Sequence, residues 1–363
     1  MRTSGAPRIR WVWLGAALVA ASLAGCGGAR SSASPVSPSS PAPTSTGTPT
    51  LGDGPTVRVS SSSQLDRALG ALVNGTTILL AAGRYDVPGE AFMLPEHLRQ
   101  ITIAGESGRR DDVVVRGGRF GFWANDVTGL TIRDLTIEGA SEHGVILNCQ
   151  AHAPVLRNLV LRDIGDQFVK GNPGPGGCGV DDGVVEGSLF EYTRGASDTY
   201  TNGVDVHYGG GWTIRGNTFR GFWSASGLVG PAVLFWNASH DTVVEDNTFT
   251  DNARDISLGL DAGKPAQPPV SSGALPDHRA GRISRNTITR RAGLPGADVG
   301  IMVADSPGTR VDGNTITMAG TYPNAIEYRF PRTTGVVIAD NVVDAAILAR
   351  EGATASLSNN VRR

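Results

Sequence analysis

The feature that most constrains the fold of this chain is a short unit that recurs along most of its length. Each unit consists of a short apolar strand, a polar turn that often contains asparagine, and a second short strand. One unit cannot bury its own apolar face, whereas stacked units share a continuous core, so repeats at a spacing of about 20–40 residues predict a solenoid. The clearest units are 130–139, 155–162, 184–190, 212–219, 243–249, 283–288, 311–316 and 336–343.

Composition agrees with thin stacked layers. The 363 residues include 49 glycines and only 6% aromatic residues, which suits many tight turns better than a helical bundle. A leucine-rich repeat is excluded because its Leu-x-x-Leu-x-Leu frame is missing. A propeller stays an alternative, although the units lack a fixed blade length.

The start of the repeats indicates a capped end. A strand at 56–59 precedes a short helix for which Ser63 is the expected N-cap, and a buried strand follows at 76–80. This order resembles the N-terminal cap of pectate-lyase-like β-helices. The resemblance implies an all-β, single-domain right-handed parallel β-helix over 56–363, with an N-terminal capping helix.

Asparagines recur at the turns between paired strands. We expect them to adopt left-handed backbone conformations and to hydrogen-bond to one another along the stack. They are Asn158, Asn217, Asn247, Asn286, Asn314 and Asn341.

The first residues have the pattern of an export signal. A basic segment precedes the apolar stretch 11–21, and Leu23-Ala24-Gly25-Cys26 follows. This resembles the lipobox of bacterial lipoproteins, which implies removal of residues 1–25 and lipidation of Cys26. The alternative is a plain secretory signal. Residues 26–55 are rich in Ser, Pro and Thr and predict a disordered tether to the envelope membrane, on its extracytoplasmic side.

Two cysteines remain in the repeat region. Cys149 and Cys178 fall in successive units, and an exported chain meets an oxidising compartment, so a disulfide is expected. The alternative is two separate buried thiols.

The third strand of each unit aligns by its pattern. The aligned segments are 145–148, 169–172, 204–207, 233–236, 256–259, 301–304, 326–329 and 347–350. Alternation directs the second and fourth residues of each segment outward. The outward residues that we expect to form a site are Lys170, Asp205 and His207 as catalytic groups, and Asn148, Asn172, Trp236, Glu327 and Arg329 as substrate-binding groups.

This column can support proton abstraction at C5 of a uronic acid. Such chemistry needs a cation near the carboxylate, a base and an acid. Lys170 would supply the cation and His207 the base, with Tyr200 or Tyr208 as the acid. The alternative is a surface ion pair of Lys170 with Asp205, beside a solvated His207.

The segment Asn202-Gly203-Val204-Asp205-Val206-His207 resembles the Tyr-Gly-Phe-Asp-Pro-His motif of mannuronan C5-epimerases. The resemblance implies that Asp205 and His207 act with Lys170. Asn202 replaces the Tyr of that motif and Val206 replaces its Pro. For the second catalytic His of that family, His240 is the nearest candidate.

The sequence therefore favours an enzyme of acidic polysaccharides, by lyase or C5-epimerase chemistry. Two alternatives stay open: a non-catalytic glycan-binding or scaffolding lipoprotein, and a polygalacturonase-like hydrolase, which needs paired carboxylates.

We expect a monomer whose partners are a polysaccharide and, through the anchor, a membrane. A net charge of −2 gives no indication of nucleic-acid binding. No cofactor is required and no metal ligand set is assigned. Loop acids such as Asp181, Asp182, Asp251, Asp255 and Asp261 could hold calcium.

Overall fold

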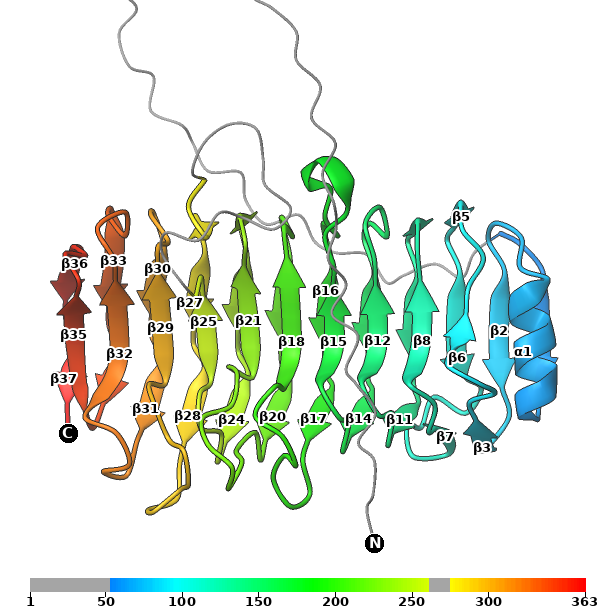
Figure 1. The fold of residues 1–363 in the computed structure, drawn as a ribbon, viewed down its shortest axis with the longest axis horizontal. Helices are drawn as coiled ribbons and strands as arrows, with labels where there is room; N and C mark the ends of the chain where they lie inside the picture. Colours follow the sequence, from blue (N-terminus) through cyan, green and yellow to red (C-terminus); the bar gives the residue numbers. More distant parts are fainter. Residues whose placement is uncertain (1–52, 261–274) are drawn as a thin grey trace, which may run out of the picture. The chain divides into compact units, whose positions relative to one another are not determined.

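The repeats fold as predicted, as stacked coils of parallel strands. The computed structural model describes residues 53–260 and 275–363. Within them, each coil contributes strands to three long sheets, which run side by side along the stack (Figure 1).

Sheet A has twelve strands among the described residues. They are β1 (Thr56–Val59), β2 (Thr77–Leu80), β6 (Thr102–Gly105), β10 (Thr131–Arg133), β13 (Val155–Arg157), β16 (Val184–Glu186), β19 (Thr213–Arg215), β23 (Val243–Glu245), β27 (Arg282–Ser284), β30 (Arg310–Asp312), β33 (Val336–Ala339) and β36 (Ala355–Ser358).

Sheet B has eleven strands in the same described ranges. They are β3 (Gly83–Asp86), β7 (Val113–Arg116), β11 (Thr136–Glu138), β14 (Val160–Arg162), β17 (Leu189–Glu191), β20 (Thr218–Arg220), β24 (Thr248–Thr250), β28 (Thr287–Thr289), β31 (Thr315–Thr317), β34 (Val342–Val343) and β37 (Val361–Arg362).

Sheet C, counted over the described part of the chain, has ten strands. They are β4 (Phe92–Met93), β8 (Phe120–Ala124), β12 (His143–Leu147), β15 (Gln167–Gly171), β18 (Asn202–His207), β21 (Val233–Trp236), β25 (Ile256–Leu258), β29 (Ile301–Ala304), β32 (Asn324–Arg329) and β35 (Ala346–Arg350). Two short ladders pair β5 (Leu98–Arg99) with β9 (Val127–Thr128) and β22 (Ser239–His240) with β26 (His278–Arg279).

One apolar core fills the space between the sheets. Alternation directs every second side chain inward, where equal positions of successive coils meet. Phe190, Phe219 and Phe249 show this, because their rings stack with centroids 4.6 and 5.0 Å apart. This shared burial makes each coil depend on its neighbours.

The asparagine ladder is confirmed over five of the predicted residues. From Asn217 to Asn341, each side chain bonds along the stack to the next through Nδ2 and Oδ1, at 2.9–3.0 Å, and the ladder continues to Asn360. Asn158 is not part of it and bonds to Asp134 instead. Ser188 holds the ladder position next to Asn217.

The prediction that the asparagines adopt left-handed backbone conformations is wrong for the turns of the ladder. In the ladder coils the residue before the asparagine has positive φ, as at Gly216, Asp246 and Arg285. Asn158 itself has a φ of 49°. The ladder asparagines thus serve as hydrogen-bonding groups, whereas their predecessors turn the chain.

Helix α1 (Ser62–Gly70) lies against the first coil, at the end of the stack opposite β37 (Figure 1). Its N-cap is Ser61 rather than Ser63, because the Ser61 hydroxyl accepts a hydrogen bond from the Gln64 amide. Leu65 and Leu69 are the buried residues of this helix. No helix in the described residues is long and apolar enough to cross a membrane.

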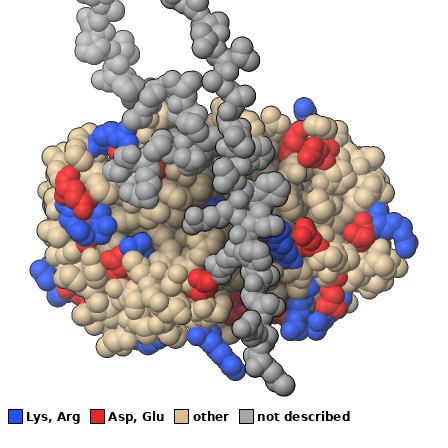
Figure 2. Space-filling view, in the orientation of Figure 1, with Lys and Arg blue, Asp and Glu red and all other residues tan. Residues whose placement is uncertain are grey.

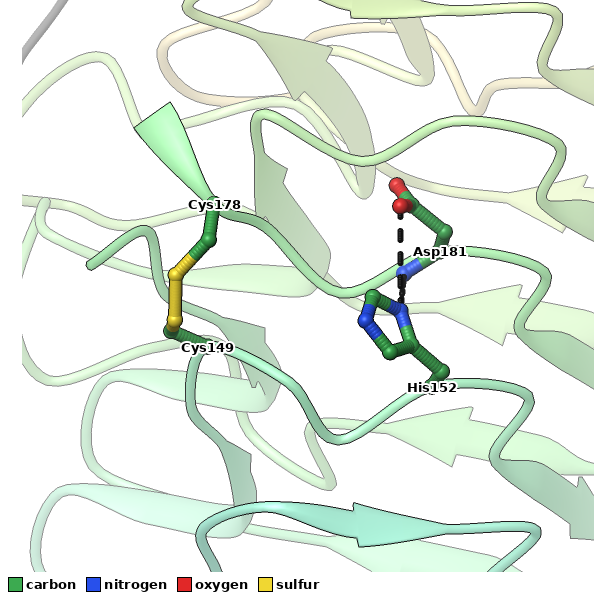
Figure 3. Close-up of a disulfide and its surroundings, with 4 residues drawn as sticks. All are labelled: Cys149, His152, Cys178 and Asp181. Atoms are coloured by element: carbon green, nitrogen blue, oxygen red, sulfur yellow. Dashed lines mark hydrogen bonds and ion pairs between the residues drawn. A yellow bond between two sulfur atoms is a disulfide. The ribbon is translucent and has the colours of Figure 1, made fainter. Parts of the chain in front are cut away.

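The predicted disulfide joins Cys149 and Cys178 across adjacent coils, with their Cα atoms 5.6 Å apart (Figure 3). It closes a loop that contains the short 3-10 helix η1 (Pro175–Gly177). His152 and Asp181 pair beside it, with Nδ1 and Oδ2 3.7 Å apart.

Figure 2 shows acidic and basic side chains interspersed on the face in view. The signal segment, Cys26 and most of the tether lie outside the described residues.

Candidate active site on sheet C

The register predicted for the third strands is confirmed throughout sheet C. Val169 pairs with Val204, which places Lys170 opposite Asp205, and His207 lies opposite Trp236 on the next strand. The remaining pairs follow the same alignment through to Ile326 and Ile347. Since Val204 and Val206 fill the core, Asp205 and His207 face outward.

Lys170, Asp205 and His207 are in direct contact. Lys170 Nζ lies 2.5 Å from Asp205 Oδ2 and 2.9 Å from His207 Nε2. His207 Nε2 lies 3.4 Å from Asp205 Oδ1. We call these three residues the triad. It combines a cation, an anion and an imidazole on one sheet face.

Two residues of β21 and the turn after it support the triad. The indole Nε1 of Trp236 donates to Asp205 Oδ1 at 2.9 Å, and its ring lies edge-on to His207 with centroids 4.6 Å apart. The Asn237 side chain contacts His207 Nδ1 at 2.9 Å. Trp236 therefore orients both acidic and imidazole groups, a role that its predicted sugar contact did not include.

The triad is buried. The side chains of Lys170, Asp205 and His207 are 6%, 4% and 16% exposed. A solvated surface ion pair, the alternative interpretation of these residues, does not fit this burial. Buried charges persist only when they are paired and hydrogen-bonded, as here.

The environment sets the charge of each triad residue. Burial opposes ionisation of Asp205, but the Lys170 ammonium, which is also hydrogen-bonded to this carboxylate, and the adjacent His207 outweigh it and hold its pKa well below the usual range. Burial lowers the pKa of His207 and Lys170 reinforces the effect, against the pull of Asp205. Asp205 is thus an anion and His207 a neutral imidazole at neutral pH.

The predicted substrate-binding asparagines form a chain of amides beside the triad. Asn172 Nδ2 donates to Asn148 Oδ1 at 3.0 Å, and Asn148 Nδ2 donates to Asn125 Oδ1 at 2.5 Å. Asn125 in turn donates to Glu96 at 3.2 Å. Trp123 Nε1 also donates to Asn125 Oδ1, at 2.7 Å.

Glu327 and Arg329 are placed differently from the expectation. Glu327 is fully buried, and its carboxylate binds both Arg329 and Arg350. Asn324 and Tyr322 donate to its other oxygen, at 2.6 and 3.2 Å. These four donors leave Glu327 as the centre of a buried ion-pair cluster instead of a group open to a ligand.

Sequence reasoning missed three neighbours of the triad. Asn237 follows the strand segment that was aligned. Trp123 lies one strand before the aligned segments, and it faces outward opposite Ile146. His143 shows no metal-ligand spacing, yet its ring is coupled electrostatically to Lys170 and Asp205, and burial, reinforced by Lys170, lowers its pKa to about 4. Extending the alignment by one strand toward the N-terminus would have found Trp123.

The remaining candidates for proton transfer lie at the margins. Tyr200 is 61% exposed on the loop before β18. Tyr208 follows β18 directly, and burial raises its pKa. His240 lies on β22, outside sheet C, where its Nδ1 contacts Asp241 Oδ2 at 2.7 Å.

Two of the candidate calcium acids, Asp255 and Asp251, are paired with arginines. Asp255 pairs with the buried Arg290 at 2.7 Å, and Asp251 pairs with Arg291 at 2.9 Å. Asp261 lies outside the described residues. In residues 53–260 and 275–363, no group of three or more His, Cys, Asp or Glu side chains could hold a metal ion.

Comparison with known proteins gives structural matches alone. No protein-family model and no curated protein matches the sequence. An alginate lyase from Paenibacillus superposes with a TM-score of 0.58 at 18% identity, covering 84% of this chain and 99% of that one.

Two further solved structures are similar. A polygalacturonase from Erwinia carotovora gives a TM-score of 0.60 at 12% identity, covering 86% of this chain and 95% of its own. A lacto-N-biosidase from Eubacterium ramulus gives 0.55 at 11%, covering 85% of this chain and 68% of its own. At these identities the likeness concerns the fold, and the chain is a right-handed parallel β-helix.

Proposed function

We propose that this chain acts on an acidic, uronate-containing polysaccharide by lyase or C5-epimerase chemistry. The observation that carries the proposal is the contact set of Lys170, Asp205 and His207 on the outward face of sheet C. Two of the structural neighbours are named for enzymes of uronate polymers, an alginate lyase and a polygalacturonase, and they support a polysaccharide substrate.

Each triad residue has a defined task in this chemistry. The Lys170 ammonium binds the substrate carboxylate, which makes the C5 proton more acidic by stabilising the enolate. Neutral His207 removes that proton, and the electron pair passes to the C5–C6 enolate. Asp205 holds the Lys170 ammonium in place and stabilises the imidazolium that forms.

The reaction then has two outcomes. In a lyase, the enolate electrons form a C4–C5 double bond while the C4–O bond breaks and the leaving oxygen takes a proton. In an epimerase, C5 takes a proton on its opposite face and no bond in the chain breaks. The contacts of the triad serve both outcomes up to the enolate.

Lys170 also controls access to the base. In the free protein its ammonium occupies His207 Nε2 at 2.9 Å. An ammonium has three protons to donate, so a substrate carboxylate can draw Lys170 from the imidazole without breaking its bond to Asp205. Binding of the acidic substrate would therefore free the nitrogen that abstracts the proton.

The test is an assay of His207→Ala against a panel of uronate polymers. Ultraviolet absorbance detects unsaturated ends, and NMR detects inversion at C5. We expect loss of activity of at least about a hundredfold, the size of a general-base contribution. His97→Ala is the matched control, because His97 is 82% exposed and lies outside sheet C. Full activity in His207→Ala would overturn the proposal.

The two alternatives give other results in the same assay. A binding protein would retain polymer without forming product. A hydrolase would release reducing ends without unsaturation. Asp277, a second acid coupled to His207, accepts hydrogen bonds from the Asn237 and Leu260 amides at 2.7 and 2.6 Å, which favours a structural role for it.

We also propose that the chain is exported and anchored through Cys26, and that it works as a monomer without a required cofactor. The lipobox-like residues before Cys26 support the anchor. Labelling of growing cells with a fatty acid should mark the wild-type chain and leave Cys26→Ser unlabelled.

A further inference from the structure

We propose that sheet C carries a sugar-binding subsite on the N-terminal side of the triad, built around Trp123. It would bind a sugar unit of the polymer through its ring face and hydroxyl groups rather than through its carboxylate. The inference rests on the proposed function, because it assigns the unit of the same polymer chain that lies two strand steps from the reacting unit.

The first observation is an apolar column that leads to the triad. Successive strands place Met93, Trp123 and Ile146 at the outward position that Lys170 and Asp205 occupy further along. Met93 is 54% exposed, Trp123 is partly exposed and Ile146 is buried. Aromatic rings in such positions provide flat apolar surface for the face of a sugar.

The orientation of Trp123 is fixed. Its ring packs edge-on to Phe120 with centroids 5.0 Å apart, and its Nε1 is bonded to Asn125. A ring held from both sides loses little conformational entropy when a ligand stacks on it. Trp123 is thus a rigid surface rather than a mobile side chain.

Polar groups line both sides of this column. On one side runs the amide chain of Asn125, Asn148 and Asn172, which reaches the position beside His207. An Asn side chain can form up to four hydrogen bonds, so each retains capacity for a hydroxyl group. On the other side stand His143 and Gln167 on neighbouring strands.

His143 and Gln167 carry the second, independent observation. His143 Nδ1 and Gln167 Oε1 are buried and have no hydrogen-bond partner within the described part of the chain. Phe120 stacks on the His143 ring at 5.4 Å and holds it in place. Unpaired buried polar atoms are rare because each costs free energy, and a bound polar ligand is one explanation for them.

The charge of this surface selects the mode of recognition. The residues of β8 and β12 include no Lys and no Arg. Arg119, which directly precedes β8 and lies over the Phe120 ring, is paired with Glu142 at 2.8 Å. A carboxylate would therefore find no cation on these strands, whereas hydroxyl groups would find amides and an imidazole. Neighbouring strands lie about 4.8 Å apart, a step comparable with one sugar unit, so a polymer whose reacting unit lies on Lys170 would extend over Trp123.

The experiment measures binding of saturated uronate dimers, tetramers and hexamers by calorimetry. The full chain, purified in mild detergent, carries His207→Ala so that the oligomers stay intact. We expect the longer oligomers to bind more tightly than the dimer, and Trp123→Ala to weaken the hexamer by about tenfold while leaving the dimer unchanged. Trp123→Phe should keep most of the higher affinity of the hexamer over the dimer, and Gln167→Leu should lose part of it.

Leu357→Ala is the matched control, because Leu357 is 48% exposed on β36 of sheet A. Hexamer affinity that is unchanged in Trp123→Ala would overturn the subsite and leave the proposed function intact. Neutral oligomers that bind as tightly as acidic ones, with the same loss in Trp123→Ala, would support the subsite and contradict the acidic substrate. Absence of binding by every oligomer would overturn both.

Discussion

At the scale of single residues, the triad combines high burial with full pairing. Lys170 and Asp205 are almost inaccessible to solvent, and each charge is compensated by the other. Removing both charges costs far less than removing one, because a lone buried charge has no compensation. This asymmetry makes the pair testable through stability as well as through activity.

Lys170→Met should destabilise the protein by about 3–5 kcal/mol, since it leaves Asp205 buried without its cation. The double variant Lys170→Met, Asp205→Leu should recover most of that loss. Denaturant unfolding measures both. Arg84→Met is the control, because Arg84 and Asp86 form a pair that is 55% and 66% exposed, where we expect a change below about 1 kcal/mol. Equal losses in the single and double variants would contradict the expectation.

A buried histidine gives a second prediction, on pH. His278 on β26 is fully buried between Ser306 Oγ and Thr242 Oγ1, each 3.0 Å from a ring nitrogen. Burial, with smaller contributions from His240 and Arg279, lowers its pKa to about 3. Its pKa in the unfolded chain is about 6.5, so the unfolded state binds more protons below that pH.

Stability should therefore fall as the pH drops from about 6.5 toward 3. His278→Gln should be less stable at neutral pH but should lose less stability over this interval. Thermal melts across the pH range measure the two slopes. The exposed Leu357 provides the control variant Leu357→Gln, which removes no titrating group and should keep the wild-type slope. A slope unchanged in His278→Gln would show that another group governs the acid response.

The residues of the triad could be predicted because the strand sequences show both the alternation of inward and outward side chains and the register between strands. Val145, Val169, Val204 and Val233 align without gaps, and that alignment alone brings Lys170 and Asp205 together. Asn237 and the burial of Glu327 could not be predicted in this way. They depend on turns and on side chains of other coils, for which no periodic pattern exists.

At the scale of elements, the asparagine ladder shows how one turn position supports its neighbours. Asn286 Nδ2 donates to Val244 O at 2.9 Å and to Asn314 Oδ1 at 3.0 Å, and its Oδ1 accepts from Asn247. The repeated asparagines predicted the ladder, but they did not predict that the residue before each of them has the positive φ. The sequence of each turn permits either residue to adopt it, and stacking decides which does.

Asn286→Ala should destabilise the protein by about 1–3 kcal/mol, because it leaves buried backbone and amide groups unpaired. Asn359→Gly is the control, since Asn359 is exposed, makes none of the ladder's hydrogen bonds and has a φ of 54° that glycine adopts readily. Its stability should change by less than about 0.5 kcal/mol. Chemical unfolding of both variants decides, and similar losses in the two would contradict a special role of the ladder.

At the scale of the whole molecule, sheets A, B and C make a stack in which each coil contacts mainly the coils before and after it. Stability in such an array is close to a sum of neighbour terms, so damage at an end should spread from that end. The order of coils could be predicted from the repeats. The closeness of His143 to Lys170 depends on how two coils meet, which the repeats do not specify.

Leu69→Asp is the corresponding test at the capped end. Leu69 is 1% exposed under α1, so the carboxylate would have to be buried or the helix would have to leave the first coil. Release of α1 exposes the edge of the core, and we expect amide exchange to rise first in β1, β2 and β3 and last in β18 and β21. Leu357→Asp, at an exposed position of β36, should leave the exchange of β1 to β3 unchanged. Exchange that rises equally in all coils of Leu69→Asp would mean that the stack unfolds as one cooperative unit.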